Sequence, residues 1–178
     1  TRIAIHYMYT NNSTVTGNIS EGNHVGFALI FSKKLKVYGN QSIGDRDHGI
    51  LLNYTNGSVI RDNLVKDGNG KCVFIYNSSK NRFLDNRFER CKIGIHFTAG
   101  SERNEMTGNA FVANATQVKY VGTTDIDWSK AGRGNYWSDN PAFDLDGDGI
   151  ADTPYRPNDM VDQVVWEHPA AKLLLNSP

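Results

Sequence analysis

The sequence predicts an all-β chain that folds as a right-handed, single-stranded parallel β-helix of about six rungs of 22–23 residues, followed by an irregular C-terminal capping tail. Three observations support this fold: a repeat of that length, short alternating apolar strands inside each repeat, and an asparagine at the same place in each. Such a period indicates a stacked architecture in which no single unit buries its apolar side alone.

Asparagine accounts for 19 of the 178 residues, and six asparagines recur at intervals of 22 to 26 positions. They are Asn18, Asn40, Asn63, Asn86, Asn109 and Asn135. Asparagine tolerates the left-handed backbone of a tight corner, and its amide can hydrogen-bond to the next asparagine along a column. We therefore expect one vertical asparagine ladder, with successive strands about 4.8 Å apart.

The alternation of apolar and polar residues within each repeat separates the core from the surface and predicts three inward ladders. The first is Ile5, Phe27, Ile50, Val73, Ile95 and Val118. The second is Tyr7, Leu29, Leu52, Ile75, Phe97 and Tyr120. The third is Val15, Val37, Ile60, Phe83 and Met106, which makes Met106 a core residue and not a metal ligand.

The alternate residues of the first strand in each repeat must face outward, yet many of them are apolar. This outward set includes Ala28, Ile30, Leu51, Phe74, Tyr76 and His96. A contiguous exposed apolar patch indicates a partner-binding surface or the underside of another part of the chain. The sequence leaves both interpretations open.

His6 and Met8 lie two residues apart on the first predicted strand, so their side chains point to the same side, about 6–7 Å apart. Imidazole together with thioether favours copper over magnesium or calcium. These two residues are therefore copper candidates, although two ligands do not complete a site. His24, His48 and His96 fall in other columns and predict no histidine cluster.

Two aspartates suggest an alternative, enzymatic interpretation. Asp62 and Asp85 both precede a corner asparagine, which stacks them about 5 Å apart, with Arg61 and Arg87 beside them. Paired carboxylates at such a distance serve glycosidases and polysaccharide lyases. The simpler interpretation is a lattice of Asp–Arg pairs on a solvated edge, because the equivalent positions in other repeats are glycines.

Composition excludes further classes. The chain has 19 basic and 19 acidic residues, which argues against a nucleic-acid binder, and no apolar run is long enough to insert into a membrane. Because residue 1 already lies inside a predicted strand, we expect the chain to be a piece of a longer protein. Cys72 and Cys91 are interpreted as buried small apolar side chains, with a disulfide or a thiolate metal site as the alternatives.

Charge and proline content change near residue 136, so residues 1–135 are expected to form the β-helix and residues 136–178 the tail. In the tail, Asp144, Asp146, Asp148 and Asp152 alternate around glycines, as in the first part of an EF-hand calcium loop. Tyr155 stands where the bidentate Glu of such a loop would be.

The aspartates therefore predict either a calcium site or a loop held by Asx turns. Asp139, Asp159 and Asp162 are further candidate ligands for the calcium site. Trp137, Phe143 and Trp166 are expected to pack the cap, and Pro169 to begin a short terminal helix.

The repeats together with GNYWSDNPAFDLDGDGIADTPY (134–155) and DQVVWEHPAAKLLLNSP (162–178) resemble the C-terminal part of the NosD family, periplasmic β-helix proteins of nitrous oxide reductase maturation. The resemblance implies a non-enzymatic role in copper delivery to that reductase in the periplasm. It also implies copper as the metal, and ABC transporter subunits, a copper chaperone and the reductase as partners. It places no copper ligand residue by residue.

Three hypotheses follow in order of preference. The first is a periplasmic scaffold for copper-site assembly. The second is a carbohydrate-active β-helix enzyme, a lyase, epimerase or hydrolase, that uses Asp62 and Asp85. The third is a cell-surface structural module with a calcium-stabilised cap.

Overall fold

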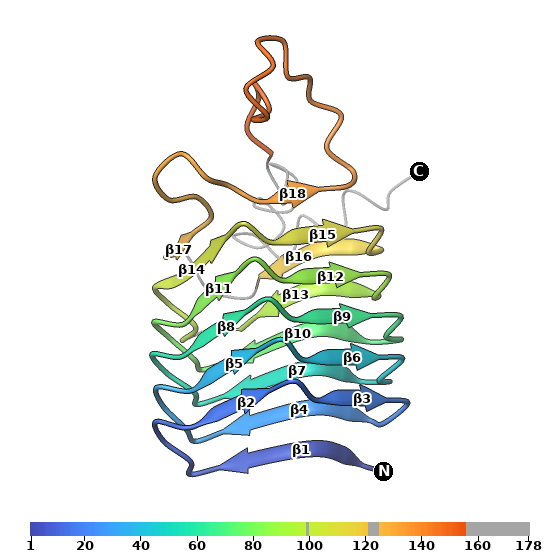
Figure 1. Ribbon diagram of the computed structural model, residues 1–178, viewed down its shortest axis with the longest axis vertical. Helices are drawn as coiled ribbons and strands as arrows, with labels where there is room; N and C mark the ends of the chain where they lie inside the picture. The colour runs from blue at the N-terminus through green and yellow to red at the C-terminus, as the bar shows by residue number, and fades with distance from the viewer. Residues whose placement is uncertain (99, 121–124, 156–178) are drawn as a thin grey trace, which may run out of the picture. The chain divides into compact units, whose positions relative to one another are not determined.

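The computed structural model describes residues 1–98, 100–120 and 125–155, and every regular element in these ranges is a β-strand. The strands form three parallel sheets of six, and each strand pairs with its counterpart one turn later (Figure 1). The predicted parallel β-helix of about six rungs is confirmed.

Each rung contributes one strand to each sheet. The first sheet contains β1 (Ile3–Met8), β4 (Val25–Ile30), β7 (His48–Asn53), β10 (Lys71–Tyr76), β13 (Ile93–Phe97) and β16 (Thr116–Tyr120). The second sheet contains β2 (Thr14–Thr16), β5 (Lys36–Tyr38), β8 (Val59–Arg61), β11 (Arg82–Leu84), β14 (Asn104–Thr107) and β17 (Ile126–Asp127). The third sheet contains β3 (Ile19–Glu21), β6 (Gln41–Ile43), β9 (Leu64–Lys66), β12 (Arg87–Glu89), β15 (Ala110–Val112) and β18 (Tyr136–Trp137).

The register of the sheets confirms the three predicted inward ladders, whose members pair directly from rung to rung. Phe27, Ile60 and Met106 are at most 1% exposed. The third sheet adds a fourth inward ladder that the sequence analysis did not identify. Its members are Ser20, Ser42, Val65, Phe88, Phe111 and Trp137.

The predicted hydrogen-bonded asparagine ladder is confirmed, but in the first five rungs the residue before each asparagine, and not the asparagine itself, has the left-handed backbone. The backbone N–H and the side-chain amide of Asn63 both donate to Oδ1 of Asn86, at 3.1 and 2.9 Å. The amide of Asn63 donates in addition to the carbonyl oxygens of Val37 and Arg61. Because Asn63 is 2% exposed, these bonds satisfy backbone groups that water cannot reach.

Every one of the first five rungs turns at four corners, and one residue at each corner has a positive φ. The first corner is formed by Tyr9, Phe31, Tyr54, Asn77 and Gly100. The third corner, just before the asparagine ladder, is formed by Gly17, Gly39, Asp62, Asp85 and Gly108. A single left-handed residue between extended ones bends the chain sharply, which explains why asparagine, aspartate and glycine recur there.

Cys72 and Cys91 form a disulfide, so the preferred interpretation of two separate thiols is wrong. Both residues are buried, as expected. In the preceding rung the equivalent positions are Gly49 and Gly68, and a Cβ at Gly49 would lie 2.2 Å from Cγ1 of Val65. The space at this corner is therefore too small for most side chains, but two cysteines fill it by bonding to each other.

Residues Thr1–Asp139 form one compact unit and Asn140–Pro178 another. The last strand of the first unit, β18, places Trp137 against Phe111, with parallel rings 4.4 Å apart. Phe143, which was expected to pack the cap, is 76% exposed. Asp159, Asp162, Trp166 and the terminal helix expected from Pro169 lie outside the described residues. No helix in the described part of the chain could span a membrane.

Candidate functional site

The outer face of the first sheet, defined here by the outward side chains of its six strands, is the surface that the sequence analysis selected. Leu51, Phe74 and His96 lie on it side by side in successive rungs. Ile30, Leu51, Phe74 and His96 are half-buried, and Tyr76 is 41% exposed. Ala28, by contrast, is fully covered by its surroundings and offers no accessible surface.

Phe74 is the centre of this face. Its ring contacts His48 on one side and His96 on the other, with ring centroids 5.0 and 5.1 Å away. The ammonium of Lys71 lies 4.8 Å from the centroid of the same ring, which is a cation–π contact. The sequence analysis missed His48 and Lys71 because they start their strands, one position outside the alternating pattern used to define the face.

The pKa values of both histidines are lowered. Burial, followed by the charges of Lys71, Lys119 and His48, lowers the pKa of His96 from 6.5 to about 4. Burial and then Lys71 lower the pKa of His48 as well. Both imidazoles are therefore neutral at neutral pH and each carries one N–H donor and one bare nitrogen.

An aromatic column borders the outer face at the first corner. Tyr9, Phe31 and Tyr54 stack with ring centroids 5.2 Å apart, and Tyr54 meets Tyr76 edge to face at 6.0 Å. All three stacked residues have positive φ, which is uncommon for bulky side chains. They are 42–71% exposed, so they extend the apolar surface. The sequence signal for this column is its spacing of 22 and 23 positions.

The two copper candidates lie on the same outer face, at its N-terminal edge. His6 and Met8 are both exposed and pair with Ala28 and Ile30 of the next rung. Their side chains alternate outward from β1, as predicted. Imidazole and thioether donors fit copper(I), which accepts soft ligands.

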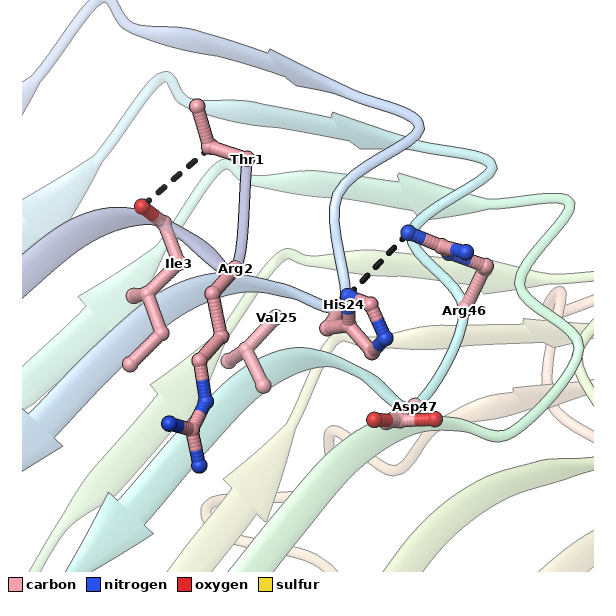
Figure 2. Close-up of a pocket in the computed structure, with 7 residues that line it drawn as sticks. All are labelled: Thr1, Arg2, Ile3, His24, Val25, Arg46 and Asp47. Atoms are coloured by element: carbon pink, nitrogen blue, oxygen red, sulfur yellow. Dashed lines mark hydrogen bonds between the residues drawn. The ribbon is translucent and has the colours of Figure 1, made fainter.

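A hollow of about 750 Å³ lies near this edge and includes Arg2, His24, Arg46 and Asp47 (Figure 2). Nδ1 of His24 is 3.1 Å from a guanidinium nitrogen of Arg46, which occupies that imidazole nitrogen. Among the described residues, three or more candidate metal ligands converge only in the aspartate loop.

The two candidate catalytic aspartates are each bound to an arginine. Asp62 pairs with Arg61, and Asp85 pairs with Arg133 at 2.5 Å. Arg87 pairs with Glu89 and not with either aspartate. Both aspartates are thus engaged in ion pairs at the surface, and Arg87 does not take part in them.

The aspartate loop brings together three of its four predicted ligands. Carboxylate oxygens of Asp144, Asp146 and Asp148 lie within 4.8 Å of one another. Asp144 accepts backbone N–H groups of Gly149, Asp148 and Gly147, and these bonds lower its pKa. Asp152 accepts the N–H of Leu145 at 2.9 Å. This geometry suits a hard divalent cation, with one side open to water.

Comparison with known proteins identifies the family. Residues 1–142 match the family model described as "Periplasmic copper-binding protein (NosD)". The chain is 48% identical over 166 residues to a "Probable ABC transporter binding protein NosD" of Stutzerimonas stutzeri. The matched region covers 85% of this chain and 38% of that protein. The chain is 47% identical over 160 residues to the protein of the same description in Pseudomonas aeruginosa, covering 83% of this chain and 37% of that protein.

The chain thus spans less than two fifths of the length of these two relatives. The family match extends over all the rungs that carry the outer face and both copper candidates. The chain belongs to the NosD family of periplasmic copper-binding proteins.

Proposed function

We propose that this chain is the β-helical part of a non-catalytic accessory protein that binds a protein partner on the outer face of the first sheet and offers copper ligands at its surface. The observation that carries the proposal is the outer face itself. It is apolar around Leu51 and Phe74 and lies on a rigid stack of paired strands. A contiguous apolar surface on a rigid support is typical of a site that binds a partner.

Copper is the cargo in this proposal, and His6 with Met8 is the contact. Both side chains are exposed on one face of β1, where a partner can deliver or remove an ion. An open, two-donor contact binds copper(I) reversibly, which is what transfer between proteins requires.

A copper(I) competition titration tests this contact. We expect the His6→Ala/Met8→Ala variant to bind copper(I) roughly tenfold more weakly than the unchanged chain. His24→Ala is the matched control, because that imidazole is engaged by Arg46. Equal affinity of the double variant and the unchanged chain would remove His6 and Met8 as ligands.

The partners we propose are ABC transporter subunits, a copper chaperone and nitrous oxide reductase, whose copper sites would be assembled with this protein. The description of the two relatives as ABC transporter binding proteins supports a transporter partner. The test is retention of the longer, natural protein by membranes that contain the transporter. Leu51→Asp should abolish retention, whereas Leu64→Asp should not, since Leu64 is a half-buried outward leucine of the same rung on the third sheet.

The enzymatic alternative is less well supported, because Asp62 and Asp85 are each paired with an arginine. A carbohydrate-active enzyme of this type needs one carboxyl group free to give or take a proton. Turnover of a polysaccharide that is lost in Asp62→Asn/Asp85→Asn would reverse this ranking.

A second function, calcium binding by the tail, rests on a separate observation. The clustered oxygens of Asp144, Asp146 and Asp148 suit calcium, and backbone bonds already hold the loop in shape. A bound cation would neutralise three adjacent carboxylates and stabilise the tail. The third hypothesis, a calcium-stabilised structural module, depends on this site alone.

A further inference from the structure

The outer face of the first sheet carries all the buried side-chain polar atoms that lack a hydrogen-bond partner in the described residues. They are Nδ1 of His48, Oδ1 of Asn53, and both ring nitrogens of His96. Buried polar groups in folded proteins are almost always paired, so four unpaired atoms on one face require an explanation. Each costs free energy until a partner supplies the missing bond.

The same face has an unbalanced charge. None of its six strands contains an aspartate or a glutamate, whereas Lys71 and Lys119 both project from it. No carboxylate of the described residues lies within ion-pair distance of either ammonium. The charges of Lys71 and Lys119 both lower the pKa of His96, and the charge of Lys119 also lowers the pKa of Lys71. These effects indicate that the two ammonium groups lie near each other.

The other two sheets show the opposite pattern. On the second sheet, Arg82 pairs with Glu105 at 3.1 Å, and on the third sheet Arg87 pairs with Glu89. The strands of these two sheets therefore contain acidic as well as basic residues, and some of them form ion pairs within the chain. On the first sheet, by contrast, no acidic residue stands among the strands, and Lys71 lies against the apolar ring of Phe74. The nearby Asp47 raises the pKa of Lys71 but forms no ion pair with it.

We propose that the outer face of the first sheet binds an acidic segment of a partner protein, in which aspartate or glutamate stands next to apolar residues. The apolar side chains pack on Phe74 and Leu51. A carboxylate accepts hydrogen bonds from the ammonium groups of Lys71 and Lys119 and from an imidazole N–H of His96. The unpaired atoms of His48, Asn53 and His96 are covered in the free chain, so the partner reaches them only when the side chains around Phe74 move on docking. The inference rests on the docking role proposed above and adds the chemistry of the docked surface.

Selection from a random dodecapeptide library displayed on phage tests the proposal with the full chain as the bait. We expect the selected peptides to be enriched in Asp and Glu beside aromatic or aliphatic residues. Synthetic copies should bind Lys71→Glu/Lys119→Glu roughly tenfold more weakly or worse, and Lys71→Gln/Lys119→Gln by a smaller factor. Copies in which Lys replaces the acidic residues should recover binding to the charge-reversed variant.

Two further variants separate failure of the acidic preference from failure of the docking role. Leu51→Asp should lose the selected peptides, whereas Leu64→Asp on the third sheet should keep them. Peptides that bind both variants equally do not use this face, and the docking role then fails as well. Peptides that depend on Leu51 but carry no excess of acidic residues overturn the acidic preference alone. A selection that yields no binding peptide also overturns the acidic preference.

Discussion

The disulfide between Cys72 and Cys91 joins the first strand of one rung to the last corner of the same rung, 19 residues later. The rung before it has Gly49 and Gly68 at these positions, and the rung after it has Gly94 and Asn114. The bond closes a single turn of the β-helix into a covalent ring. It also suits the oxidising periplasm in which this family works.

Replacing both cysteines with serine should lower the free energy of unfolding by about 2–5 kcal/mol, since the cross-link restricts the unfolded chain and the pair is buried. Urea unfolding with and without a reductant measures the effect. The reductant should destabilise the unchanged chain by a similar amount and leave the serine variant as it was. Equal stability of the two chains would mean that the ring is not closed in solution.

Asn63→Ala should destabilise the chain by about 3 kcal/mol or more, because it removes the acceptor of the buried Asn40 backbone N–H and the amide donor to the carbonyl oxygens of Val37 and Arg61. Asn69→Ala is the matched control, since Asn69 is exposed. Urea unfolding of the two variants provides the comparison. A similar loss of unfolding free energy in both variants would show that the ladder hydrogen bonds of Asn63 contribute little to stability.

His96 should titrate near pH 4 in the folded chain, as monitored by its imidazole NMR signals. Because its folded pKa is lowered below 6.5, the unfolded chain binds more protons between these values, and the free energy of unfolding decreases as the pH falls through this window. Phe74→Ala should admit water and raise the pKa of His96. Leu64→Ala should not move it, and an unchanged pKa in Phe74→Ala would assign the shift to the lysines instead.

Calcium should bind the aspartate loop with a dissociation constant of about 10⁻⁴–10⁻³ M, as in extracellular modules. Terbium luminescence, with calcium as competitor, measures this binding. Asp144→Ala should abolish it, since Asp144 belongs to the cluster and also holds the loop through three backbone bonds. Asp127→Ala, at an exposed aspartate of β17, should leave it unchanged. Binding that survives Asp144→Ala would place the cation elsewhere.

The sequence was sufficient to predict the stack, its register and its three main ladders. These depend on a period that is repeated five times, so that an error in one repeat is corrected by the others. The inward position of Met106 and the bonding of Asn63 to Asn86 follow directly from this period. The outward position of Phe74 follows from the alternation along a strand.

Only the tertiary structure decided which side chains meet. The bond between Cys72 and Cys91 depends on how closely two corners of one rung approach, which no spacing reveals. The contact of His48 with Phe74 joins neighbouring rungs across two different columns, and the pairing of Asp85 with Arg133 reaches across 48 residues. Backbone register repeats with the sequence, but side-chain contacts depend on rotamers and corner angles that differ from rung to rung.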